Sequence, residues 1–96
     1  MPYEAGRLVW IPCDVKPGPF ADERIIRIFS DGGTWVGFVQ EDALREPVIE
    51  GSTFVRAVIV KVDGGRFNAR VAGEPVASRL FEGTLSRIQP LAAVQA

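Results

Sequence analysis

The sequence predicts an all-β fold, a small single-domain antiparallel β-barrel of five to six strands with one short helical turn. Two observations predict this class. Apolar and polar residues alternate with a period of two along most of the chain, in stretches rich in β-branched and aromatic residues. Ten glycines and seven prolines divide the 96 residues into short segments. A chain of this length forms one core, so we expect one domain over residues 1–96, with a frayed tail at 91–96.

Six segments have the alternation and composition of strands: residues 7–13, 23–29, 34–40, 53–63, 66–71 and 84–89. Residues 41–46 form at most one helical turn, because Pro47 has no N–H to donate to a continuing helix. Segment 72–83 has no clear pattern. This order of elements predicts a barrel whose last strand is 84–89.

The tripeptide Asp-Gly-Gly occurs twice, at residues 31–33 and 63–65. We interpret both copies as hairpin turns, because a two-residue turn that matches strand twist favours positive φ at its central positions, which glycine adopts easily. A phosphate-binding loop is the alternative, but its glycines would lead into a helix, and here both copies lead into strands.

Each turn predicts a strand register. A turn at 64–65 sets Asp63 opposite Arg66 and directs alternate valines to the core, namely Val58, Val60 and Val62. Ile59 then lies on the solvated face, so either segment 72–83 or a second copy of the chain is expected to cover it. A turn at 32–33 pairs Ile28 with Gly37, and a glycine within a strand indicates close approach of another backbone.

The residue types argue against catalysis. The chain has no histidine, which removes the commonest general base and the usual zinc ligand. Its single cysteine, Cys13, can form neither an internal disulfide nor a thiolate metal site and is expected to be a buried, inert thiol. The acidic residues lack the spacing of a calcium loop. We therefore predict a protein that is not an enzyme and has no metal site or cofactor.

Charge and hydropathy limit the partners. The formal net charge is -1, but the first 50 residues carry five basic and nine acidic side chains, and the last 46 carry six basic and three acidic. This asymmetry indicates either internal or self-associating complementarity or a basic ligand-facing side. No apolar run approaches the roughly 20 residues of a membrane span, and we find no secretory leader, so we expect a cytoplasmic protein without membrane contact.

Two binding hypotheses remain. In the first, the protein is a non-catalytic module for protein–protein interaction or self-association, with Phe20, Trp35 and Ile59 as partner-binding residues. Phe20, in the proline-rich loop 14–22, either folds back as a lid or forms an exposed aromatic platform with Tyr3, Trp10 or Trp35. In the second, the basic hairpin binds single-stranded nucleic acid through Lys61, Arg66 and Arg70, and Arg87 of the closing strand is a candidate fourth residue.

The segment "GGTWVGFVQEDALRE", residues 32–46, resembles the distal part of a bacterial SH3-like barrel, where a glycine-flanked aromatic strand runs into one short helical turn. The resemblance implies a small barrel that binds peptide, cell-wall or nucleic-acid ligands without catalysis, with Trp35 as the one ligand residue carried over. An OB-type barrel fits the same order of elements and is the alternative fold.

Overall fold

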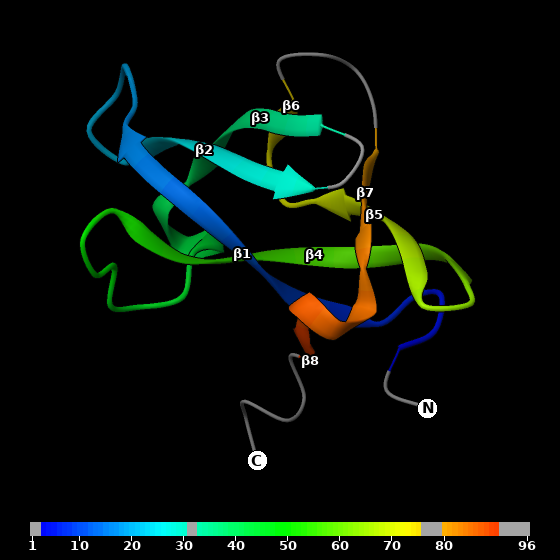
Figure 1. Cartoon of the computed structure of the whole chain (residues 1–96). Helices are drawn as coiled ribbons and strands as arrows, with labels where there is room; N and C mark the ends of the chain where they lie inside the picture. Colours follow the sequence, from blue (N-terminus) through cyan, green and yellow to red (C-terminus); the bar gives the residue numbers. More distant parts are fainter. Residues whose placement is uncertain (1–2, 31–32, 76–79, 91–96) are drawn as a thin grey trace.

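The computed structural model describes residues 3–30, 33–75 and 80–90, which form one antiparallel sheet curled into a nearly closed barrel (Figure 1). Its longer strands are β1 (Leu8–Pro17), β2 (Glu23–Ser30), β3 (Gly33–Gln40), β4 (Ser52–Asp63), β5 (Arg66–Val71) and β7 (Phe81–Thr84). The two-residue strands are β6 (Glu74–Pro75) and β8 (Gln89–Pro90), and the 3-10 turns are η1 (Glu41–Ala43) and η2 (Leu85–Arg87). The predicted all-β barrel is confirmed.

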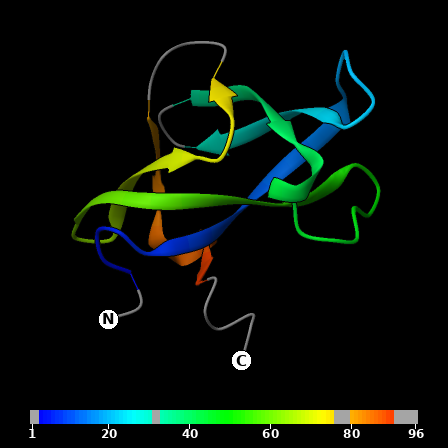
Figure 2. The same ribbon diagram turned by 180° about the vertical axis from the view of Figure 1, so that it is seen from behind.

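Strand β1 is the central strand of the sheet. The spatial order of strands is β6-β3-β2-β1-β4-β5-β7, and β8 also pairs with β1. One edge of β1 pairs with β4 without interruption from Leu8 to Asp14. The other edge is divided, because β8 pairs only with Val9 and Trp10 and β2 pairs only from Asp14 onward. Seen from behind, β4 crosses the whole molecule (Figure 2).

The core lies on the inner face of the curled sheet, as the period of two predicts. Each long strand contributes alternate buried residues, among them Ile11 from β1, Ile26 from β2, Val39 from β3, Val55 from β4 and Phe67 from β5. The rings of Phe67 and Phe81 are 5.7 Å apart between centroids, so β5 and β7 share the core. Tyr3 joins the start of the described chain to its end, because its hydroxyl donates to the carbonyl of Ile88 at 3.1 Å.

The predicted register of the second hairpin is correct near the turn and wrong beyond it. Asp63 faces Arg66, as expected. The register then shifts between Ile59 and Lys61, which is a β-bulge at Val60. Because one extra residue reverses the side-chain alternation, Ile59 points into the core opposite Ala69, and Val60 is exposed.

Gly64 alone has a positive φ in this turn, 65°, so the expectation of positive φ at both glycines is also wrong. A positive φ at only the first central residue is the geometry of a type II′ turn, which also matches the twist of a hairpin.

The first hairpin is shifted by two residues from its predicted register. Ser30 and Gly33 close the turn, and Ile28 therefore faces Trp35 rather than Gly37. A shift of two keeps every side chain on its face, so the predicted core face is unchanged. The expected close approach at Gly37 is confirmed, because β6 pairs with it and a Cβ built there would lie 2.9 Å from the carbonyl oxygen of Glu74.

The end of the chain differs from the prediction. The last long strand is β7 (Phe81–Thr84), and residues 85–87 form η2 rather than part of a strand over 84–89. Segment 72–83, which had no clear pattern, contains β6 and the start of β7. The tail expected to fray, residues 91–96, lies outside the described residues.

Candidate binding groove

The three side chains predicted to bind a partner lie in different environments. Phe20 is 69% exposed in the loop after β1, so it is no lid on the barrel. Trp35 and Ile59 are 3% and 1% exposed. The predicted exposure of Trp35 is wrong, because Trp35 points inward with Ile28. The predicted outer-face position of Ile59 is also wrong, because the bulge turns Ile59 into the core. The single chain buries Ile59 without a second copy.

The three predicted nucleic-acid residues, Lys61, Arg66 and Arg70, share the outer face of β4 and β5, as expected. Their surroundings are not uniformly basic. A hollow of about 180 Å³ beside Lys61 and Arg66 is also lined by Asp63 and Glu82. Two carboxylates thus accompany the two cations, which weakens the attraction to a phosphate backbone.

A larger groove opens on the face of the barrel where β1 has its divided edge. Along this edge of β1, the pairing with β8 ends at Trp10 and the pairing with β2 begins at Asp14, and no strand of the described chain pairs between them. The gap is bordered by the end of β2 and by β7 and η2 (Figure 1). The resulting groove has a volume of about 460 Å³.

Pro12 lies in the middle of this gap. On the opposite edge, Val15 donates its N–H to Gly51 and Arg7 accepts from Ile59, so odd-numbered residues of β1 direct their backbone groups towards β4. Even-numbered residues therefore direct theirs to the divided edge. Because proline has no N–H, the gap leaves no backbone donor unpaired at Pro12, and only its carbonyl faces the groove.

The groove has an apolar floor and a partly exposed apolar rim. The floor consists of inward-pointing core residues, namely Ile11, Cys13, Ile28, Phe67, Phe81 and Ile88. On the rim, Phe29 from β2 is 54% exposed and Ile49 from the loop before β4 is 65% exposed. Large exposed apolar side chains around a concave surface are typical of binding sites.

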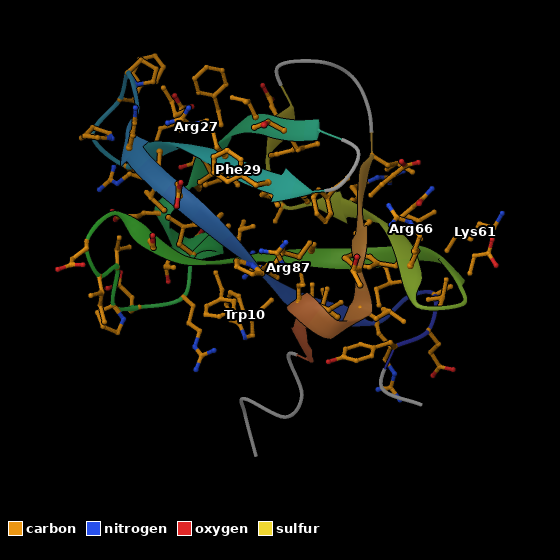
Figure 3. All side chains as sticks on the ribbon, viewed as in Figure 1. Trp10, Arg27, Phe29, Lys61, Arg66 and Arg87 are labelled. Atoms are coloured by element: carbon orange, nitrogen blue, oxygen red, sulfur yellow. The ribbon has the colours of Figure 1, made fainter. Side chains whose placement is uncertain are left out.

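The charged groups at the groove are mainly basic. Arg87 of η2 lines it directly, and the guanidinium of Arg27 lies 6.0 Å from the ring centroid of Phe29. The guanidinium of Arg45 lies 5.3 Å from the ring centroid of Phe54, which also lines the groove. Figure 3 shows Arg27 and Phe29 on the opposite side of the view from Lys61 and Arg66, with Arg87 between the two pairs.

Asp14 is the one carboxylate among the described lining residues. It accepts a hydrogen bond from the hydroxyl of Ser52 at 3.2 Å. Arg27 stands opposite Asp14 in the register of β1 and β2, but the two side chains form no ion pair in the described structure. Arg27 and Arg87 therefore keep their charges available to a ligand.

The groove has no activated nucleophile among its described residues. Cys13 is the natural candidate, but burial, with a smaller contribution from the charge of Asp14, raises the pKa of its thiol to about 12. The thiol is therefore neutral and poorly nucleophilic near neutral pH. No group of three or more His, Cys, Asp or Glu residues in the described ranges is placed to hold a metal ion.

Sequence reasoning missed Phe29 and Ile49, and it considered Arg87 only as a candidate addition to the basic nucleic-acid residues. The signal that was present is Pro12, because a proline within a strand favours an unpaired edge. The alternation of β2 also directs Phe29 outward, since Ile26 and Ile28 point inward. Ile49 and Arg87 carry no such signal, because they reach the groove only through long-range pairing.

Comparison of the chain with protein-family models, with curated protein sequences and with solved structures finds no match. Within the described residues, no helix has the length and apolar character that crossing a bilayer would require.

Proposed function

We propose that this protein is a non-catalytic binding module of the cytoplasm that recognises a segment of another protein in the groove between β1, β2 and β7. The observation that carries the proposal is the combination of a concavity of about 460 Å³ with two exposed apolar side chains, Phe29 and Ile49, on its rim. Exposed apolar groups that a partner can bury are the usual source of binding energy at such surfaces. The SH3-like resemblance implies the same class of function.

The groove favours a protein partner over nucleic acid. Single-stranded nucleic acid requires a continuous basic track with aromatic faces on which bases stack. The exposed aromatic Phe29 lies at the groove, and the Lys61 and Arg66 pair lies elsewhere, next to Asp63 and Glu82. The basic pair predicted to bind nucleic acid therefore lies away from the exposed aromatic side chain Phe29.

The test is capture of partners by the tagged chain from its host's lysate, with and without nuclease, using three variants. Phe29→Ser removes the aromatic side chain of the rim, and Phe20→Ser removes the more exposed aromatic side chain in the loop after β1. Val60→Ser is the matched control on the outer face of β4. All three positions are exposed, so each variant is expected to fold.

The proposal predicts proteins that are retained after nuclease, lost with Phe29→Ser and kept with Val60→Ser. Affinity for a purified partner should fall about tenfold or more with Phe29→Ser, since an aromatic side chain that the partner buries contributes about 2 kcal/mol or more at such sites. Loss with Phe20→Ser but not with Phe29→Ser would move the site to the loop. Partners that all vanish with nuclease would favour the basic hairpin instead.

A further inference from the structure

The chemistry of the groove limits the partner more narrowly than its shape does. The guanidinium of Arg87 lines it, and that of Arg27 lies 6.0 Å from the ring centroid of Phe29 on the rim, against one lining carboxylate in the described structure, that of Asp14. The whole chain carries a net charge of -1, so this local positive excess runs against the overall charge. A local field of this kind selects partners by sign.

Arg87 is the cation best placed to meet a ligand. It follows Leu85 in η2, lines the groove and is exposed. It forms no ion pair with the described residues. Asp14, the nearest source of a compensating charge in the lining, is instead hydrogen-bonded by Ser52. An incoming carboxylate would therefore meet a guanidinium without displacing an existing partner, and such pairs are strong when bidentate.

The backbone of β1 favours an extended conformation of the bound segment. The carbonyl of Pro12 faces the gap between β2 and β8, where no described strand donates to it. A bound segment in an extended conformation can donate an N–H there while its side chains alternate between the groove and the rim.

Resting on the proposed function, we propose that the partner is an acidic peptide segment in an extended conformation. An apolar side chain of this segment enters the groove between Phe29 and Ile49, and an Asp or Glu close to it in sequence pairs with Arg87. The expected partner motif is thus an apolar anchor next to one or more carboxylates, and a basic or neutral flank is excluded.

The test begins with a random peptide library displayed on phage and selected against the full chain. Selected peptides are then synthesised, and their affinities are measured for the wild type, for Arg87→Glu and for Arg70→Glu. Arg70 is the matched control, because it is also an exposed arginine but lies on the outer face of β5, away from the groove. Both variants change the net charge equally, so a difference in peptide affinity between them shows that the position of the arginine matters.

We expect the selected peptides to combine an apolar residue with Asp or Glu and to lose about tenfold in affinity with Arg87→Glu, which corresponds to about 1.4 kcal/mol. Arg70→Glu should change the affinity less than about twofold, because a charge that far from the site is screened by salt. Peptides with the acidic residue changed to lysine should bind Arg87→Glu better than they bind the wild type.

Three results would overturn the inference, and they differ in whether they also overturn the proposed function. Peptides that are apolar but neutral or basic, and that require Phe29, would refute the acidic partner and leave the proposed function standing. Binding of a fluorescent single-stranded oligonucleotide that depends on Arg87 would replace the peptide by nucleic acid. No selected peptide sensitive to Phe29→Ser would refute the proposed function and the inference together.

Discussion

Replacing Ile59 and Val60 by alanine, one at a time, tests the register of the longest strand. Ile59 is 1% exposed and belongs to the core, whereas its neighbour Val60 is 42% exposed. Truncating a buried isoleucine to alanine costs about 2–5 kcal/mol, because apolar contacts are lost and a cavity remains. Truncating an exposed strand valine costs less than about 1 kcal/mol, mainly through β-propensity.

Urea unfolding followed by tryptophan fluorescence measures both changes. Trp35 is buried in the folded state, so its emission reports on exposure of the core. With a slope of about 1–1.5 kcal/mol per molar urea for a domain of this size, Ile59→Ala should lower the midpoint by roughly 1.3 M or more. Since such domains have only about 5–15 kcal/mol of stability in total, this loss is large but measurable.

The relative effects of the two substitutions can refute the bulged register of β4. Without the bulge, uninterrupted alternation from the turn at 64–65 places Val60 in the core and Ile59 outside. Val60→Ala would then be the more destabilising change. A larger loss for Val60→Ala than for Ile59→Ala would therefore refute the bulge and restore the register that the sequence predicts.

Two further substitutions probe the core and the thiol. Gly37→Ala should lower the free energy of unfolding by about 1–3 kcal/mol, because its new Cβ would lie 2.6 Å from Cζ3 of Trp35 and 2.9 Å from the carbonyl oxygen of Glu74. Gly65→Ala should change it by no more than about 0.5 kcal/mol, because nothing lies within 4 Å of the new Cβ. Equal urea midpoints for the two variants would contradict this prediction. Cys13 should resist thiol reagents near neutral pH until the chain unfolds. Because its folded pKa is raised, the stability that depends on the neutral thiol is complete below pH 9.0 and falls as the pH rises towards 12, a fall that Cys13→Ala should lack.

The sequence is sufficient for the fold class and for most of the faces of the strands. Alternation assigns Ile26 and Ile28 to the core correctly even though the predicted register of their hairpin is wrong by two residues, because a shift of two preserves the face. Alternation fails at Val60, because the strand contains one extra residue there and no glycine or other turn residue in the sequence indicates the bulge. A bulge depends on how β4 must bend around the barrel, and that bend is set by strands distant in sequence.

The site residues predicted from the sequence agree with the structure less well than the predicted fold does. Residue type and the SH3-like resemblance both predict an exposed Trp35, yet the chain buries Trp35 and exposes Phe29 six residues earlier. Large aromatics serve equally well in cores and at interfaces, so their type alone does not distinguish the two. The face of the strand does distinguish them, because Trp35 shares a face with the buried Gly37 and Val39, whereas Phe29 lies opposite Thr34 on the outer face.

Pro12 connects the fold to the proposed site. If β2 had continued along β1 to meet β8, the backbone of residue 12 would have needed an N–H for that ladder, and proline has none. The residue that allows β2 to separate from β1 without an unpaired donor is thus the residue at the centre of the groove. The concavity is therefore encoded within β1 itself, and a side chain change on the rim can alter the ligand without altering the barrel.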